Sequence, residues 1–379
     1  MSNHDVIVLG AGGVGSATIY QLARRGVRVL GLDRFPAAHA LGSSHGQTRL
    51  IRLAYYEHPD YVPLVLRAYK LWEQTQQEWG QQLYHETGIL EAGPVGGELV
   101  SGIQASARQY DLPIEVLSAA EAERRWPGFR FPPDYQVIFE QRSGYLMVEQ
   151  AVAAQLEMAN RAGAELVLDE EITGWRKDGD GFLVETDKGS HRADQLVIAA
   201  GAWSNSLLTE LGLELTVLRK PLHWFQADAS YDRDAGCPAF FYEVPEGHFY
   251  GFPASDSRGL KIALHSGGEL VEDPLQVDRS IDLEERAVVT AFLERYLPGV
   301  SLVPSDHTVC MYTMTPDRFF VIDHHPAEAG VVIAAGLSGH GFKFTPVIAE
   351  IICQLLLDGR AELPIDFLSL TRAIERQES

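Results

Sequence analysis

The chain has 379 residues, of which 46% are hydrophobic and 22% are charged, and these proportions are typical of a folded globular protein, not of a disordered or collagen-like chain. Its length suits about two domains of ordinary size. The formal net charge is −21, which on average opposes contact with a phosphate backbone, so we expect no nucleic-acid partner.

The cysteines and the hydropathy pattern bear on compartment and partners. Cys237, Cys310 and Cys353 lie far apart, with no spacing typical of a disulfide framework or a metal site, so we expect a reducing compartment and no metal. No apolar stretch approaches the ~20 residues of a membrane span, and the first residues lack the pattern of a signal peptide. The sequence therefore predicts a cytoplasmic protein with no membrane partner.

The N-terminal segment predicts one strand, helix and strand unit. Residues 6–9 are a short apolar run typical of a buried parallel strand. A glycine-rich turn follows and leads into a helix predicted over residues 14–25, which ends at Gly26. A second strand is predicted over residues 27–32, and the Ala, Gly, Ser and His residues of 35–48 indicate an extended loop.

Further elements follow from periodicity and from turn residues. Helical spacing of apolar residues predicts helices over 61–79 and 148–162, and a helix over 345–357 with Pro346 as its first residue. Turn signals between short apolar runs indicate an antiparallel meander before a buried strand that ends at Gly201. Alternating residues over 217–311 predict an antiparallel sheet beside a pocket, and residues 331–335 predict a final buried strand.

These elements predict an α/β plus α+β fold. One part is a Rossmann-type dinucleotide-binding domain, and the other is a largely antiparallel β-sheet domain that holds the substrate. The chain enters the first domain three times, so we expect the dinucleotide-binding domain to be discontinuous. Its predicted segments are residues 1–85, 150–215 and 316–379, and residues 86–149 and 216–315 are the predicted substrate domain.

The glycines of the first turn have the spacing that a pyrophosphate needs. Gly10 allows the tight turn, Gly12 allows the backbone to approach the phosphates, and Gly15 allows close packing of helix on strand. Asp33 stands at the end of the second strand, where its carboxylate can accept hydrogen bonds from a ribose diol. The unit predicts a bound dinucleotide but does not distinguish NAD from FAD, because the adenosine and pyrophosphate of both are bound by these contacts.

Three longer segments resemble one family of enzymes. Residues 39–52 read HALGSSHGQTRLIR, residues 310–317 read CMYTMTPD, and residues 336–343 read GLSGHGFK. Together with the glycine turn and residues 250–265, they resemble the monomeric sarcosine oxidase and N-methyltryptophan oxidase family along the whole chain. The resemblance implies that the dinucleotide is FAD and that the protein is a flavoprotein amine oxidase.

The resemblance also implies how the flavin is held. In this family a cysteine forms a thioether with the 8α carbon of the flavin, and Cys310 occupies that motif position; taken alone, it would be an ordinary buried thiol. His45 and Arg49 are then expected beside the flavin, where positive charge would favour the reactive thiolate. The other residues expected to contact FAD are Ser43, Thr48, Gly339, His340 and Gly341. His340 and Gly341 precede a helix N-terminus, which is suited to negative charge.

The substrate site is expected to hold an amino acid by its carboxylate. Arg52 and Lys343 occupy the family's carboxylate-binding positions, and a guanidinium fork with an added ammonium suits that group. The sequence thus predicts a small cationic pocket in an acidic protein. Tyr55, Tyr250 and Tyr312 are expected to wall the substrate in, although tyrosines alone would more simply be core residues.

Lys261 and His265 lie four residues apart, so in a strand they would share one face. The resemblance implies that Lys261 lies over the flavin and promotes its reaction with O2, since a buried cation stabilises the anion formed when O2 gains an electron. The same resemblance places His265 in the substrate site near the amine. We therefore assign catalytic roles to Lys261 and His265, and also to Arg49 and His45.

Departures from the family limit the choice of substrate. Leu53 and Tyr56 stand where sarcosine oxidases commonly have His and Gly, and Ser44 replaces a common histidine. We expect oxidation of a small N-methyl amino acid, with sarcosine first, to glycine, formaldehyde and hydrogen peroxide by a monomer that uses O2. N-methyltryptophan, pipecolate or another secondary amino acid stay open as substrates. A flavin dehydrogenase with another electron acceptor and a catalytically silent dinucleotide-binding protein are the alternative functions.

Overall fold

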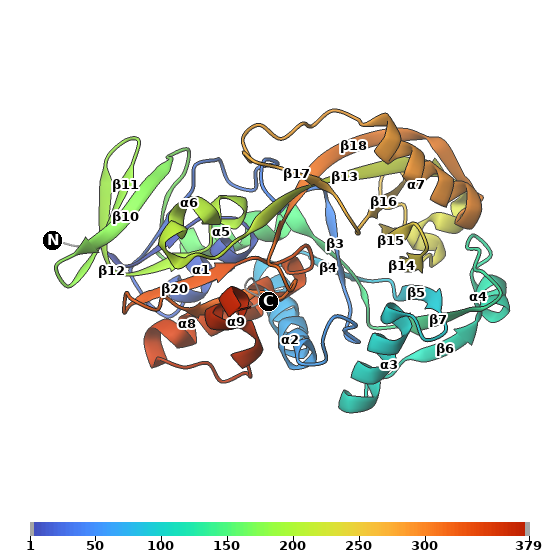
Figure 1. Ribbon diagram of the computed structural model, residues 1–379, viewed down its shortest axis with the longest axis horizontal. Coiled ribbons are helices and arrows are strands. Elements are labelled where there is room, and N and C mark those ends of the chain that lie inside the picture. Colours follow the sequence, from blue (N-terminus) through green and yellow to red (C-terminus); the bar gives the residue numbers. More distant parts are fainter. Residues whose placement is uncertain (1–3, 376–379) are drawn as a thin grey trace.

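The computed structural model describes residues 4–375 and confirms the predicted fold class, a mixed dinucleotide-binding sheet with a parallel centre joined to a larger, mostly antiparallel one. Figure 1 shows the two sheets at opposite ends of an elongated molecule, with the long strands β13 and β18 of the second sheet running side by side. A third sheet of three short strands, β3 (Thr48–Ile51), β8 (Gly144–Met147) and β4 (Tyr84–Glu86), lies between the other two in the figure.

The first sheet has eight strands and contains the predicted N-terminal unit. Its strands are β1 (His4–Leu9), β2 (Val29–Leu32), β9 (Glu165–Val167), β10 (Ile172–Asp178), β11 (Gly181–Thr186), β12 (Ser190–Ile198), β19 (Val321–His324) and β20 (Val331–Ala335). The apolar strand β1 lies between β2 and β12 and is parallel to both, so it is buried on both faces. Its end therefore points into the molecule and positions the glycine turn.

The second sheet has nine strands. They are β5 (Ile89–Pro94), β6 (Glu115–Ser118), β7 (Tyr135–Glu140), β13 (Thr216–Ala227), β14 (Ala239–Val244), β15 (Gly247–Phe252), β16 (Leu260–Leu264), β17 (Glu269–Leu270) and β18 (Val300–Met314). One face carries an aromatic core that includes Phe240, Tyr242 and Phe249. The pairing is antiparallel as predicted, except that β14 and β5 are parallel.

Helices pack on both sheets. They are α1 (Gly13–Ala23), α2 (Tyr61–Trp79), α3 (Glu98–Tyr110), α4 (Ala119–Arg125), α5 (Val148–Arg161), α6 (Ser204–Leu207), α7 (Leu283–Tyr296), α8 (Thr345–Asp358) and α9 (Leu370–Glu375). The helix α1 packs against α5 and α8, and α2 packs against α8. Among the helices of residues 4–375, none has the length and apolar character needed to cross a membrane.

Most predicted elements are found, with three differences. The helix α2 has the predicted bounds, and α5 and α8 differ from the prediction by one residue at their C-terminal ends. The helix α1 ends at Ala23, two residues earlier than predicted, because Arg24 already forms its C-cap. The helix α7 interrupts the region predicted as sheet alone, and α3 and α4 were not predicted. The domain boundaries remain a prediction.

Gly15 is the residue with the least room for a side chain in the glycine turn. A Cβ built there would lie 1.7 Å from the carbonyl oxygen of Gly10, which itself has a positive φ of 97°. We expect Gly15→Ala to displace α1 from β1 and to abolish FAD retention, measured as bound flavin per chain. Gly174→Ala is the control, because a Cβ there would meet nothing within 4 Å. Normal flavin content in Gly15→Ala would contradict the assigned role of the turn.

Candidate active site

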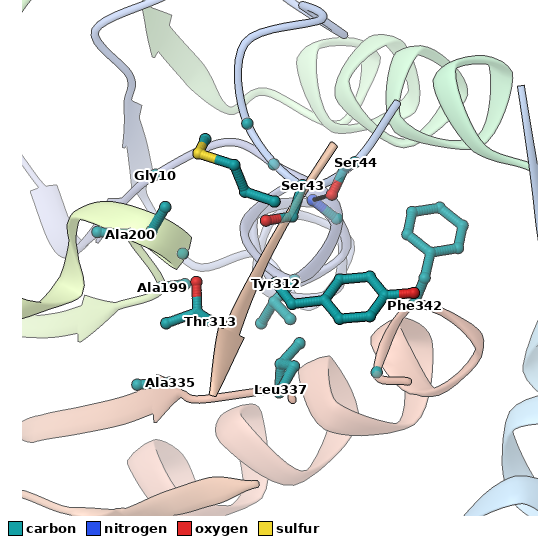
Figure 2. A pocket seen from close by; sticks show the side chains of 18 of the residues that line it. Gly10, Ser43, Ser44, Ala199, Ala200, Tyr312, Thr313, Ala335, Leu337 and Phe342 are labelled. Carbon is teal, nitrogen blue, oxygen red and sulfur yellow. Dashed lines mark hydrogen bonds between the residues drawn. The ribbon is translucent and has the colours of Figure 1, made fainter. Parts of the chain in front are cut away.

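A cavity of about 530 Å³ lies between the first and second sheets. It extends from the glycine turn to the end of β18, and Figure 2 shows Tyr312 with Gly10, Ser43 and Phe342 around it. The predicted site residues that line this cavity are Gly10, Gly12, Asp33, Ser43, Arg49, Arg52, Tyr250, His265, Tyr312, Gly339, His340, Gly341 and Lys343. The fold thus gathers residues from widely separated segments into one site.

The other predicted site residues do not line this cavity. They are Gly15, His45, Thr48, Tyr55, Lys261 and Cys310. Most of them lie directly behind the wall: Tyr55 contacts His340, and Cys310 contacts Arg49. The carbonyl and hydroxyl oxygens of Thr48 accept hydrogen bonds from Lys261, and its contact with FAD stays a prediction.

The glycine turn fits a dinucleotide. Gly12 is the N-cap of α1 and has no side chain to cap it, so the partial positive charge of the helix end faces the cavity. A Cβ built at Gly12 would meet only the Ser44 hydroxyl, at 3.8 Å, which leaves open space for phosphates. Asp33 lines the same cavity, and its carboxylate accepts hydrogen bonds from the backbone N–H of Ala11 at 2.7 Å and of Phe35 at 2.9 Å. These residues would hold the adenosine and pyrophosphate of FAD.

Cys310 is buried beside a cation. The guanidinium of Arg49 donates a hydrogen bond to its Sγ at 3.0 Å and another to the carbonyl oxygen of Ser43 at 2.9 Å. Cys310 is 1% exposed and lies on β18, immediately before Met311 and Tyr312, which line the cavity. A positive charge at this distance stabilises a thiolate, which is the nucleophilic form of cysteine.

His45 lies on a different cavity. It lines a second space of about 680 Å³, together with residues such as Trp224 and Arg258. Its Nε2 has no hydrogen-bond partner, and burial together with the nearby Arg49 lowers the pKa of His45 to about 3. The imidazole is therefore neutral at pH 7, and the positive charge closest to Cys310 is that of Arg49.

Lys261 is a buried cation site. Its Nζ donates hydrogen bonds to the carbonyl oxygens of Gly46 and Thr48 and to the Thr48 hydroxyl, and it lies 4.7 Å from the centre of the Phe252 ring. Three oxygen acceptors match the three N–H groups of an ammonium. Burial, with Arg49 nearby, holds the pKa of Lys261 well below its usual range. The charge at this position is therefore lost at a lower pH than in an exposed lysine.

Arg52 lines the cavity but is already bound to two carboxylates. Its Nη2 donates to both oxygens of Glu57 at 2.8 Å, and its Nη1 donates to Glu91 at 2.9 Å. The guanidinium also stacks near the ring of Tyr56, at 4.6 Å. This corrects the expectation of an open cationic pocket: the charge of Arg52 is balanced from within the protein, because an isolated charge would be costly at this depth.

Lys343 lies on the same wall. Its Nζ donates to the carbonyl oxygen of His340 at 2.8 Å and to the Tyr55 hydroxyl at 3.3 Å, and that hydroxyl lies 2.7 Å from Nδ1 of His340. Burial and the nearby Arg52 lower the pKa of Lys343 to about 7. Tyr55 thus holds Lys343 in place from behind, and Lys343 is partly charged at neutral pH.

His265, Tyr250 and Tyr312 also line the cavity, and they contact one another. The Tyr312 hydroxyl lies 3.3 Å from Nδ1 of His265 and 3.4 Å from the hydroxyl of Tyr250. Burial, followed by the effect of Lys220, lowers the pKa of His265 well below its usual value. A neutral imidazole can accept a hydrogen bond, so this group can orient a bound amine.

Two residues of the Arg52 cluster were not predicted from the sequence. Glu57 follows Arg52 by five positions, and Glu91 is fully buried within β5. The sequence did carry a signal for Glu91, because it is a single acid inside the apolar run of residues 89–92 and a buried acid needs a partner. Glu57 has no comparable signal, since acids are common in loops.

Comparison with known proteins agrees with this geometry. The profile of the family described as FAD dependent oxidoreductase (DAO) matches residues 5–355. The chain is 40% identical to "Monomeric sarcosine oxidase" of Bacillus sp. (strain B-0618), covering 98% of this chain and 97% of that protein. It is 37% identical to "N-methyl-L-tryptophan oxidase" of Yersinia pestis (strain Pestoides F), covering 98% and 99%. The solved structure of NikD, described as "an unusual amino acid oxidase essential for nikkomycin biosynthesis", has a TM-score of 0.84 at 28% identity over 97% of this chain and 98% of that one.

Proposed function

Because this chain belongs to the family of FAD dependent oxidoreductases and is a flavoprotein amine oxidase that acts on CH–NH bonds, we propose that its substrate is a small N-methyl amino acid, with sarcosine first. The products are then glycine, formaldehyde and hydrogen peroxide. The observation that carries this proposal is that Arg52, Lys343, His265 and Tyr250 all line one cavity.

These residues suit the two ends of an amino acid. Arg52 and Lys343 provide hydrogen-bond donors for a carboxylate, which would displace Glu57 from the guanidinium because Glu57 lines the cavity beside it. The amine would then lie toward His265, whose neutral imidazole can accept a hydrogen bond from it. A deprotonated amine has the lone pair that drives loss of hydride from the neighbouring carbon. Bound FAD would supply the two-electron acceptor for that hydride.

The aromatic residues favour a small substrate. The ring of Tyr56 contacts the rings of Phe241 and His248, at centre-to-centre distances of 5.7 and 6.0 Å, and this packing fills space beside Arg52. Tyr250 and Tyr312 close the opposite side and exclude water. A bulky side chain on the substrate would have to displace one of these rings.

The test is a panel of secondary amino acids in which hydrogen peroxide release and O2 uptake are both measured. We expect the highest kcat/KM with sarcosine and a much lower value with N-methyl-L-tryptophan. Highest activity with N-methyl-L-tryptophan or a cyclic secondary amino acid would overturn the substrate assignment. Turnover with an artificial acceptor but not with O2 would indicate a dehydrogenase.

We further propose that Cys310 is the attachment site of the flavin, supported by its contact with Arg49 and by its motif. After acid precipitation the wild-type protein should stay yellow and yield a flavinyl peptide that contains Cys310, whereas Cys310→Ser should release its FAD into the supernatant. Cys237→Ser is the matched control, because Cys237 is also buried but lies in the aromatic core of the second sheet. If the wild-type protein releases all its flavin, the attachment is wrong.

A further inference from the structure

Glu91 occupies an unusual position in the second sheet. It lies in the middle of β5, between Phe241 of β14 and Ile138 of β7, and its side chain is completely buried. Its neighbours Leu90 and Ala92 point into the aromatic core, so Glu91 points to the other face, toward the Arg52 cluster. One oxygen contacts Arg52 at 2.9 Å, while Oε2 has no hydrogen-bond partner. Burying an ionised carboxylate at the centre of a sheet costs free energy unless the carboxylate is paired with a cation and hydrogen-bonded.

We propose that Glu91 is a positioning and specificity-determining residue that works through Arg52: it holds the guanidinium from behind, and its charge sets how strongly the pocket binds a carboxylate ligand. This inference rests on the proposed function, because it takes Arg52 as the group that receives the substrate carboxylate.

The two acids bound to Arg52 are not equivalent. Glu57 lines the cavity and its side chain is 14% exposed, so a ligand carboxylate can take its place and Glu57 can turn toward solvent. Glu91 does not line the cavity, and its side chain has 0% exposure, so it has no water to turn to. When a ligand binds, Glu91 therefore stays on Nη1 and keeps the Nη2 edge of the guanidinium facing the cavity.

The retained charge of Glu91 opposes the ligand. With Glu91 ionised, the ligand carboxylate adds a third negative charge to a cluster in which Glu91 stays on the guanidinium and the displaced Glu57 stays nearby, and these charges repel one another. With Glu91 protonated, its carbonyl oxygen still accepts the hydrogen bond from Arg52 and the repulsion is absent. Ligand binding is thus favoured when Glu91 carries a proton, and the ligand in turn raises the affinity of Glu91 for that proton.

The groups around Glu91 allow it to gain or lose its proton near neutral pH. Burial raises the pKa of Glu91 to about 8, against the opposing effect of Arg52. The charged and titratable groups that act on it are Arg52, Tyr56 and Glu57 on the loop before α2, Glu140 on the adjacent strand and Lys343 on the cavity wall. Glu140 is held by the backbone N–H groups of Leu53 and Ala54, so it stays in place when a ligand binds.

The test measures binding of methoxyacetate, an acid with no second group that titrates, to the purified holoenzyme through the change in flavin absorbance. The neutral probe is methoxyacetamide, and the variant is Glu91→Gln, which keeps the oxygen acceptor for Arg52 and removes the charge. We expect the ratio of wild-type to variant dissociation constants for the acid to be near one at about pH 7 and about ten at about pH 9. The amide should show no such change.

Two outcomes overturn the inference. A ratio that stays constant between these pH values shows that the charge of Glu91 does not act on the ligand, and an equal change for the amide shows a merely structural role. If both proteins bind the acid no better than the amide at any pH, the carboxylate site itself is wrong, and the inference is overturned with it. These results are distinguishable, because in the first case Arg52→Ala still weakens acid binding.

A second measurement covers the case in which Glu91→Gln does not fold. The double variant with Lys343→Met and Lys220→Met removes the two lysines whose pKa values, about 7 and about 8, lie in this range, and it keeps Glu91. Calorimetry of methoxyacetate binding at about pH 8, in two buffers of different ionisation enthalpy, should show uptake of about half a proton per ligand. An uptake of zero in this variant overturns the role of Glu91.

Discussion

We expect substrate to reduce the flavin of the Lys261→Met variant at close to the wild-type rate. The reduced flavin should then react with O2 at least roughly a hundredfold more slowly, because the variant lacks a group that stabilises the developing negative charge. A hundredfold change corresponds to about 2.7 kcal/mol in the barrier. Methionine keeps a similar length and removes the charge from a fully enclosed position beside Gly46 and Thr48. Stopped-flow spectroscopy of the flavin separates the two half-reactions.

The neighbouring strand offers a matched control. Lys220 is also buried, and its Nζ likewise donates to three backbone carbonyls, those of His265, Ser266 and Gly267. We expect Lys220→Met to keep its reaction with O2, so that the loss in Lys261→Met is due to position and not to removal of any buried lysine. Because the pKa of Lys261 is held low, the wild-type reaction with O2 should also slow at alkaline pH, and the variant should lack this dependence. Equal O2 reactivity in Lys261→Met and wild type would rule out the role of Lys261.

Replacing Arg52 should produce the second largest effect. A charge-assisted hydrogen bond contributes about 1.5–3 kcal/mol, and a guanidinium fork makes two, so Arg52→Ala should weaken binding of sarcosine and other small acids by at least roughly a hundredfold. Arg52→Lys should restore only part of the affinity, because an ammonium cannot reproduce the fork. A secondary amine without a carboxylate should bind wild type and Arg52→Ala almost equally, which can be measured by flavin absorbance titration. Equal losses for the acid and the amine would mean that Arg52 acts through structure.

The same replacement should also affect folding. At a pH above the pKa of Glu91, removing Arg52 leaves the Glu91 carboxylate buried without its ion-pair partner, and breaking a buried pair in this way costs about 3–5 kcal/mol. The double variant with Arg52→Ala and Glu91→Gln should therefore be more stable than Arg52→Ala alone, as measured by denaturant unfolding, yet still bind acids poorly. This separates the contribution of Arg52 to stability from its contribution to binding.

Sequence periodicity located the elements whose burial depends on one face or on a continuous apolar run. The helix α2 has an apolar stripe, residues 6–9 of β1 are a continuous apolar run, and β20 is apolar throughout, so their patterns are strong. The helix α7 was missed although its buried residues Val289, Phe292, Leu293 and Tyr296 have helical spacing. The alternating residues on either side of it led to a prediction of sheet for the whole region.

The candidate site was predictable where one segment carries the chemistry, as in the glycine turn with Asp33. It was less predictable where the chemistry depends on which side chains meet across the fold. Arg52 was assigned correctly to the cavity wall, but its balance by Glu57 and Glu91 depends on contacts between the loop before α2 and strand β5. No spacing in the sequence reports such a contact, because it is set by packing of the two segments.

The cavity's two walls belong to different sheets, since Gly10 and Asp33 follow strands of the first sheet, whereas Tyr250 and Tyr312 lie on strands of the second. A single molecule that contacts both walls gains its full binding free energy only when both sheets are folded and docked. FAD in this cavity would act as a cross-link between the two halves of the protein. With FAD bound, the two halves would unfold as one cooperative unit. Without FAD, their unfolding would be less cooperative.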